Sequence, residues 1–528
     1  MSSVPEREEI EDRYRWDLES IYATDDDWET AYEAVEERLG ELRAYEGRTT
    51  DDGETLLETL RLRDELMRTV GTVVAYARMR SDEDTRDQEY QGMKSRAQAL
   101  STAAASAASF VEPEIQSCSR DDIESMIEET DGLERYDHYL EDTLRTKKHT
   151  RSAAAETFSM LTDADLTFPT VERPDGTAAE ITQSNLTSLL KEPDREFRRT
   201  VYETFYDELG NYRNTIGTTL SKAVKSHVKL AEAREYGSAR EAALDGPNVP
   251  VEVHDNLVAT VHEEIDVLHR HAELKRDALD VPDLRMWDLY VPMTESESPE
   301  LAYEDAREHV VDALAPLGEE YQSRVAEGLR SQWVDVYENR GKRSGAYSGG
   351  TYDTQPFILM NWQGEVADMF TLAHELGHSL HSQLTSESQP YVYSDYDIFV
   401  AEVASTVNET LLTRHLLETV EDERFRRHVL NEYLERFRST LFRQTMFADF
   451  EHRIHARIED GEALTPDVLD ETYGDLKREF YAPATLEGGI EREWERIPHF
   501  YYDFYVYQYA TGIAAAAAIV DRILETGE

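Results

Sequence analysis

The stretch TLAHELGHSLH, residues 371–381, contains the pattern His-Glu-x-x-His and decides how the rest of the chain is interpreted. In a helix of 3.6 residues per turn, His374 and His378 lie about 40° apart around the axis and about 6 Å apart along it. Two imidazoles placed in this way can bind one tetrahedral Zn²⁺ ion. Glu375 lies about 100° round the helix, where it can accept a proton from a zinc-bound water without ligating the metal. The spacing predicts a zinc hydrolase.

The apolar residues around the motif indicate an amphipathic helix. Leu372, Leu376 and Leu380 repeat every four residues and form a row that can pack in a core while another face carries the metal. Gly377 in mid-helix costs about 1 kcal/mol relative to Ala. We attribute it to the close approach of a substrate or a strand beside the zinc.

A hydrolytic zinc needs a third protein ligand and leaves its fourth position to water. A third histidine at the offset of the extended motif is absent, because position 384 is Leu. The segment FVAEVASTVNE, residues 399–409, offers Glu402 and Glu409 on one face of an otherwise apolar helix, where unpartnered carboxylates are costly to bury. We predict that Glu402 is the ligand and Glu409 a supporting group. We expect His381 to pack rather than to ligate.

The composition excludes several classes of protein. The chain has 528 residues, a formal net charge of −55 and 40% hydrophobic residues, so we expect a folded protein rather than a disordered acidic chain. Such a negative surface repels phosphate backbones and anionic lipids, which argues against nucleic-acid and membrane-surface partners. Only ten of the 55 basic residues are Lys. This favours a halophilic, salt-adapted protein over a merely acidic one.

The sequence also carries expectations about location. Cys118 is the single cysteine, so no intrachain disulfide can form. The first 20 residues lack a basic start and an apolar stretch, and the apolar run 513–520 is far shorter than the ~20 residues of a membrane span. We expect a cytoplasmic protein.

Long helical periodicities dominate the chain, so we expect a mainly α fold. They cover residues 28–42, 253–279 and 425–458. Residues 245–251 are expected to connect two helices.

Two β-elements interrupt the helical pattern. The turn signal at 174–176 predicts a β-hairpin within 167–186. Residues 357–360 predict a strand shortly before the zinc helix. We divide the chain into an N-terminal helical domain (1–112), a middle segment with the hairpin (113–195) and a catalytic domain (196–528).

The sequence resembles the thimet-oligopeptidase family of zinc metallopeptidases, and within it oligoendopeptidase F. The resemblance is carried by HELGHSLH (374–381), FVAEVASTVNE (399–409), RSGAYSGG (343–350) with QPFILMNW (355–362), IPHFYYDFYVYQYATG (497–512) and RWDLESIYATDDDWE (15–29). These stretches are spread over nearly the whole chain.

The resemblance implies a two-lobed helical body with a deep substrate channel and a small β-element next to the zinc helix. It implies one Zn²⁺ per chain, short peptides as substrates, and Glu402 as the third ligand. His499 and Tyr509 are expected to act on the oxyanion. The substrate-binding residues expected from the same stretches are Gly345, Tyr347, Tyr502 and Tyr505. Tyr501 and Tyr507 are expected to pack.

These expectations describe a zinc endopeptidase in which Glu375 activates the water. A zinc exopeptidase of carboxypeptidase-like type is the first alternative, and a non-catalytic peptide-binding protein is the second. The sequence leaves the oligomeric state open between a monomer and a small homo-oligomer.

Overall fold

The computed structural model describes residues 4–145, 153–294 and 299–527. The chain is mainly α-helical, as the sequence predicts, and the strands of the described residues form small sheets. It divides into two compact units, each made of separate stretches of sequence. Unit 1 contains 1–148, 299–419 and 516–528, and unit 2 contains 149–298 and 420–515.

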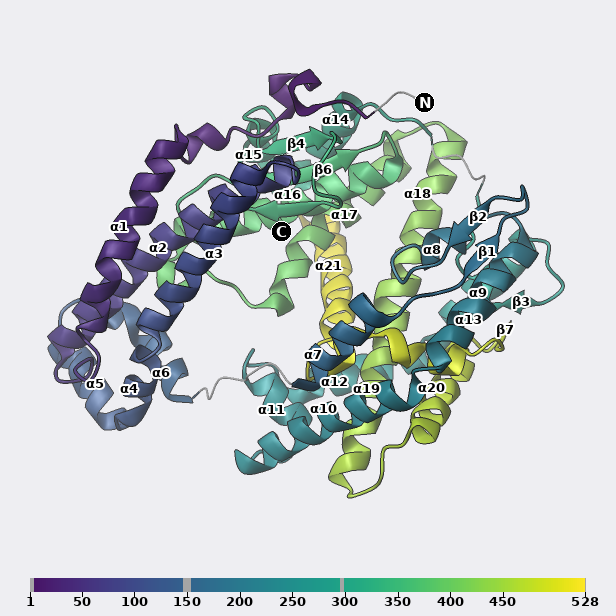
Figure 1. Ribbon diagram of the computed structural model, residues 1–528. Helices are drawn as coiled ribbons and strands as arrows, with labels where there is room; N and C mark the ends of the chain where they lie inside the picture. Colours follow the sequence, from purple (N-terminus) through teal and green to yellow (C-terminus); the bar gives the residue numbers. More distant parts are fainter. Residues whose placement is uncertain (1–3, 146–152, 295–298, 528) are drawn as a thin grey trace. The chain divides into compact units, whose positions relative to one another are not determined.

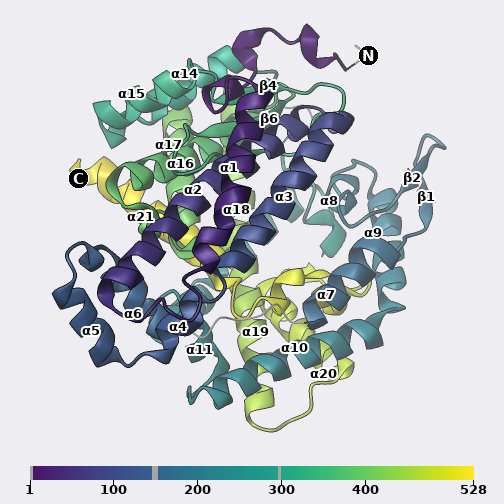
Figure 2. The same ribbon diagram turned by 60° about the vertical axis from the view of Figure 1, so that its left-hand side comes forward.

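Unit 1 begins with three long helices that pack side by side (Figure 1; Figure 2). Each starts at a residue whose side chain accepts backbone N–H groups of the first turn: Thr24, Asp52 and Asp87. Trp28 is buried at their interface, and its indole N–H donates to the Val73 carbonyl at 2.9 Å. The same core continues into the strand Phe357–Trp362 through Phe357 and Leu359.

The helices of unit 1 are α1 (Asp25–Arg43), α2 (Gly53–Glu83), α3 (Gln88–Ala108), α4 (Val111–Ser117), α5 (Arg120–Glu129), α6 (Asp137–Arg145), α14 (Tyr303–Ala313), α15 (Glu319–Gly328), α16 (Val366–Ser388) and α17 (Ile398–Thr419). Its strands are β4 (Val334–Tyr337), β5 (Tyr347–Gly349) and β6 (Phe357–Trp362).

The sheet of unit 1 has the order β4-β6-β5. β4 runs parallel to β6, and β5 is antiparallel to it, with Ser348 opposite Ile358. β5 and β6 both contact α16. The predicted strand at 357–360 is confirmed. By pairing with β5, it positions the Gly-rich segment at residues 343–350 next to α16, the helix that carries the His-Glu-x-x-His motif.

The helices of unit 2 are α7 (Ala153–Met160), α8 (Leu186–Leu189), α9 (Arg195–Gly210), α10 (Arg213–Ala233), α11 (Ala239–Asp245), α12 (Val251–Glu263), α13 (Ile265–Ala278), α18 (Glu423–Arg436), α19 (Arg443–Glu459), α20 (Pro466–Phe480) and the first part of α21 (Tyr507–Thr526). Its strands are β1 (Thr170–Glu172), β2 (Ala178–Glu180), β3 (Leu284–Arg285) and β7 (Ala484–Thr485).

Several local predictions are confirmed in unit 2. β1 and β2 form the predicted antiparallel hairpin, and residues 246–250 connect α11 to α12. The predicted helix 253–279 is interrupted at Glu264, whose φ of −98° and ψ of 14° are not helical, so that α12 ends at Glu263 and α13 begins at Ile265. The predicted helix 425–458 contains a wider turn with π-type hydrogen bonds at Phe437–Phe442 between α18 and α19. The apolar periodicity of the sequence continues through both interruptions, so it predicts one continuous helix in each case.

The two units cut the chain differently from the three consecutive domains drawn from the sequence. Residues 196–528 are shared between both units, because the chain enters unit 2 after 148, returns to unit 1 at 299 and leaves it again after 419.

None of the helices in the described ranges combines the length and the apolar character that crossing a membrane requires.

Candidate metal centre

The helix α16 carries the His-Glu-x-x-His motif on one face and a core face opposite. At its N-terminus, Glu365 and Asp368 form reciprocal side-chain-to-backbone hydrogen bonds that cap the first turn. Leu372, Leu376 and Leu380 are fully buried, as the spacing predicts. The packed leucine row fixes the rotation of the helix, and therefore the direction in which its histidines point.

Helix α17 packs closely against α16 at Gly377, where a side chain would leave no room. A Cβ atom at Gly377 would lie 2.5 Å from Ser405 Cα and 2.9 Å from the Ala404 carbonyl oxygen. The buried Asn408 also donates a hydrogen bond to the Ala373 carbonyl at 3.1 Å. The glycine therefore admits the helix that carries the predicted third ligand, where the sequence had suggested a substrate or a strand.

This packing brings the predicted donor atoms together. Nε2 of His374 lies 3.0 Å from Nε2 of His378, and the Glu402 carboxylate lies 3.6 Å from the first nitrogen and 3.8 Å from the second. The three ligand atoms lie within 4.8 Å of one another, as a single metal ion requires. Zn–N bonds of about 2.0–2.1 Å at tetrahedral angles separate donor atoms by about 3.3–3.4 Å.

The protonation of the two imidazoles suits a cation rather than a hydrogen bond. Nδ1 of His374 donates to Oε1 of Glu409, which can only accept, so Nε2 of His374 carries a lone pair. Burial is the main cause that lowers the pKa of His378 to about 4, with smaller contributions from His374 and His381 in their protonated forms, so the His378 ring is neutral near pH 7. Two imidazoles and a carboxylate are a common donor set for catalytic zinc, and the residues present fit that ion.

Glu375 is 8% exposed and adjoins the Gly-rich segment. Burial raises the pKa of Glu375, while the neighbouring His374 and a hydrogen bond from the Ser348 backbone lower it. The Ser348 hydroxyl also lies 2.8 Å from the Ser379 hydroxyl, which ties β5 to α16. A carboxyl group held in a water-poor place next to the paired histidines is suited to accept and return a proton.

A cleft of about 1000 Å³ opens beside these groups within unit 1. It is lined by β5 and the turn after it, by α16 from His378 to Ser386, and by the segment that leads into α17, including Tyr396. His381 does not belong to the donor group, because its ring stacks on Tyr396 at 3.8 Å between centroids. The expectation that His381 packs is confirmed.

Two predicted substrate-binding residues also lie in unit 1. Gly345 has φ +86°, and its carbonyl accepts a hydrogen bond from the Asn361 side chain at 2.8 Å. The Tyr347 hydroxyl donates to Asp82 at 2.9 Å, and its ring packs on the core shared with the N-terminal helices. Their contact with substrate stays a prediction.

The remaining predicted residues form one aromatic cluster in unit 2. The ring of His499 stacks on Tyr505 at 5.7 Å between centroids, and the Tyr509 hydroxyl lies 3.3 Å from His499 Nε2. Tyr502 packs edge-on against the first two rings. Burial lowers the pKa of His499, so its ring tends to stay neutral. The structure groups these four residues together, and their role opposite the metal stays a prediction.

Two residues that shape the site, Asn408 and Ser348, are not among those predicted from the sequence. Asn408 is fully buried in α17, and its Oδ1 accepts a hydrogen bond from the Tyr321 hydroxyl at 3.1 Å. An amide directly before Glu409, in the segment that carries Glu402, was the available signal in the sequence. Ser348 contacts Glu375 through its backbone N–H, and no sequence signal predicts this contact.

Two family profiles match the chain. That of Peptidase family M3 covers residues 188–528, and that of Oligopeptidase F covers residues 114–158.

Relatives extend the match to the whole chain. Oligopeptidase PepF from Bacillus subtilis is 43% identical over all of this chain and 81% of its own length. Group B oligopeptidase PepB from Streptococcus agalactiae is 40% identical over 98% of this chain and 89% of its own. Among solved structures, oligoendopeptidase-F from Enterococcus faecium aligns with a TM-score of 0.69 at 34% identity, covering 95% of this chain and 88% of that one. A Chlamydophila abortus protein described as a peptidase aligns with a TM-score of 0.90 at 33% identity, covering 99% and 91%.

Proposed function

Because the chain belongs to peptidase family M3, and is therefore a metallopeptidase, we propose that it is a zinc endopeptidase that cleaves internal bonds of short peptides. The observation that carries the proposal is the convergence of His374, His378 and Glu402 beside the buried Glu375. The names of the relatives, oligopeptidase and oligoendopeptidase, support peptides as the substrate class.

His374, His378 and Glu402 would hold the ion. When bound, zinc supplies Lewis acidity, which lowers the pKa of a water molecule towards about 7 and polarises a carbonyl group. Glu409 would fix the orientation and the tautomer of the His374 ring through its hydrogen bond to Nδ1.

Glu375 is the proposed general base and acid. Its carboxylate takes a proton from the attacking water and returns it to the nitrogen of the leaving amine. The Ser348 backbone N–H holds the carboxylate in place, and burial keeps bulk water away from it. An extended peptide could bind along the backbone of β5, the strand that is antiparallel to β6. Recognition through the main chain would make cleavage tolerant of the peptide's sequence.

The C-terminal aromatic cluster is proposed to serve the transition state. His499 and Tyr509 would donate hydrogen bonds to the oxyanion, and losing one such donor typically costs about 3 kcal/mol. Tyr502 and Tyr505 would contact the substrate, as would Gly345 and Tyr347. The mutual hydrogen-bonding distance of Tyr509 and His499 supports a shared role.

Product mapping on a peptide of ten residues, with and without a chelator, tests the proposal. We expect cleavage at internal bonds that stops when the chelator is added and returns with Zn²⁺. Release of single terminal residues would favour the exopeptidase instead. Binding of the peptide without any cleavage would favour the non-catalytic alternative.

The composition supports a second proposal, that the protein is adapted to concentrated salt. Of the ten lysines, Lys275, Lys342 and Lys477 have buried ammonium groups that contact carboxylates, so even fewer face the solvent. A net charge of −55 repels itself strongly unless salt screens it. Dialysis from molar KCl into low salt should lower the melting temperature, and an unchanged value would contradict the adaptation. The cytoplasmic location stays a prediction.

A further inference from the structure

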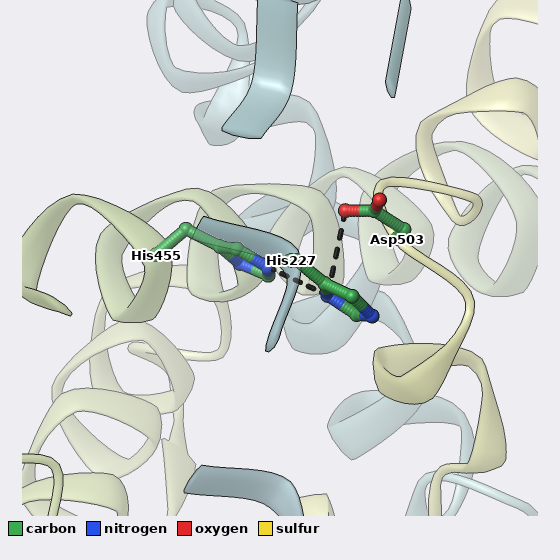
Figure 3. A group of neighbouring side chains, drawn as sticks. All are labelled: His227, His455 and Asp503. Carbon is green, nitrogen blue, oxygen red and sulfur yellow. Dashed lines mark hydrogen bonds and ion pairs between the residues drawn. The ribbon is translucent and has the colours of Figure 1, made fainter. Parts of the chain in front are cut away.

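A second group of two histidines and one carboxylate lies in unit 2, on residues that the proposed mechanism does not use. His227 comes from α10, His455 from α19, and Asp503 from the turn that precedes α21. Figure 3 shows Nδ1 of His227 between the His455 ring and the Asp503 carboxylate. Their ligand atoms lie within 4.8 Å of one another, the same criterion that the His374, His378 and Glu402 group meets.

Two of the three donor distances in this group match those around a tetrahedral metal ion, and the third, between His455 and Asp503, lies within 4.8 Å. Nδ1 of His227 lies 3.2 Å from Nε2 of His455 and 3.4 Å from Oδ1 of Asp503. Donor atoms at zinc-like bond lengths and tetrahedral angles are about 3.3–3.4 Å apart. His227 and His455 are buried, at 8% and 0% exposed, and Asp503 is half-buried. The three side chains therefore lie in the interior of unit 2 and are not a chance grouping of surface residues.

Hydrogen bonding leaves the group incomplete without a cation. Nδ1 of His455 lies 2.8 Å from the Glu451 backbone carbonyl, which can only accept, so a neutral His455 turns the lone pair of Nε2 towards His227. Oδ1 of Asp503 accepts no hydrogen bond from the described part of the chain. One N–H on Nδ1 of His227 can serve only one of these two acceptors well, whereas a cation serves all three atoms.

The backbone at Asp503 points to the same conclusion. Asp503 has φ +51° and Phe504 has φ +59°, the left-handed region that non-glycine residues rarely adopt. The Phe504 N–H donates to Oε1 of the buried Glu451 at 2.7 Å, in the same turn of α19 that ends at His455. The chain thus holds a strained turn in the position that directs the Asp503 carboxylate at the two imidazoles.

We propose that His227, His455 and Asp503 form a second metal site, which takes one divalent transition-metal ion of the zinc class and fastens the turn at residues 503–504 to α10 and α19. Imidazole with one carboxylate is a donor set that Zn²⁺ accepts readily. The Glu451 carbonyl orients the His455 ring in the way that outer hydrogen bonds orient metal-bound histidines. The ion would have a structural role, because the turn it fastens lies between His499 and α21.

Zinc binding by the full-length His378→Ala protein tests this site apart from the proposed catalytic one. The protein is stripped with a chelator, reloaded with Zn²⁺ in molar salt to suppress binding by exposed carboxylates, and analysed for bound metal after gel filtration. We expect one equivalent of zinc per chain. Adding Asp503→Asn or His455→Gln should remove it, whereas His452→Gln, a histidine on the same helix outside the group, should leave it in place.

Two further measurements guard against a variant that fails to fold. Zn²⁺ should raise the melting temperature of the His378→Ala protein and should not raise that of the His378→Ala, Asp503→Asn protein. Co²⁺ in place of Zn²⁺ should give visible absorption bands that Asp503→Asn abolishes. A His378→Ala protein that binds no zinc would show that His227 and Asp503 form only a protonated ion pair. Zinc binding that survives both Asp503→Asn and His455→Gln would equally overturn the proposal.

Discussion

The two groups of histidine and carboxylate differ in how the chain brings their donors together. In unit 1, His374 and His378 are four residues apart on one helix, and Glu402 joins them from the next helix. In unit 2, His227 and His455 are 228 residues apart, and Asp503 comes from a third segment. The spacing of residues along one helix therefore predicts the two histidines of the first group. The donors of the second group come together only through tertiary packing.

The groups also differ in what lies beside them. The first has a buried carboxyl group, Glu375, one residue from a donor, and a cleft of about 1000 Å³ reaches His378. The second has the strained turn at Asp503 and the Glu451 backbone carbonyl. A base next to an open cleft suits catalysis, and a clamped turn suits a structural ion. The donor set alone therefore does not decide whether a metal site is catalytic or structural.

The largest expected effect separates the two groups by chemistry. Glu375→Gln should lower kcat by about 10²–10⁴-fold, because the amide cannot accept the proton of the attacking water. Its metal content should equal that of the wild type, since Glu375 is not a ligand. Cleavage of a fluorogenic peptide and metal analysis of the same sample measure both.

The control for Glu375→Gln is Glu387→Gln, on the same helix α16. Glu387 is exposed and pairs with Arg324 at 2.7 Å, so its loss should leave kcat unchanged. Full turnover by Glu375→Gln would remove this residue from its role and leave the two groups without a functional distinction.

A smaller effect is expected from the group that orients the first histidine. Glu409→Gln replaces the anion that accepts from His374 Nδ1 and should weaken zinc binding about 10–100-fold. The corresponding acceptor for His455 is a backbone carbonyl, which no substitution removes. Competition with a chromophoric chelator measures the affinity. Glu418→Gln, at an exposed position of α17, should bind zinc as the wild type does, and an equal affinity for Glu409→Gln would contradict the orienting role.

The smallest effect concerns the contact that delivers Glu402. Gly377→Ala places a Cβ 2.5 Å from Ser405 Cα, in backbone that cannot move aside, and overpacking of this kind costs about 1–3 kcal/mol. Gly40→Ala, in a helix with open space around it, should instead stabilise the protein by about 0.5–1 kcal/mol. Calorimetric melting temperatures compare the two variants. A Gly377→Ala protein as stable as Gly40→Ala would show that α16 and α17 do not need the glycine.

Local patterns in the sequence predicted much of the fold and of the first site. The leucine row of α16, the strand β6 and the hairpin at 170–180 follow from the spacing of apolar residues and from turn chemistry. The break at Glu264 did not, because the apolar pattern continues on both sides of it.

Local sequence patterns did not predict which distant segments of the chain pack against each other. The glycine at 377 was recognised as a close approach, but its partner, α17, became visible only in the packed structure. His227, His455 and Asp503 have no shared spacing to detect, since the three segments meet only through the packing of α10, α19 and the turn before α21.

The metal content of Glu402→Ala after stripping and reloading with Zn²⁺ shows whether Glu402 is a ligand of the catalytic ion. If His374, His378 and Glu402 hold the catalytic ion, this variant binds one equivalent less than the wild type and no longer cleaves peptides. An unchanged metal content together with chelator-sensitive cleavage would show that the ion is held elsewhere, and the account of the site would be wrong.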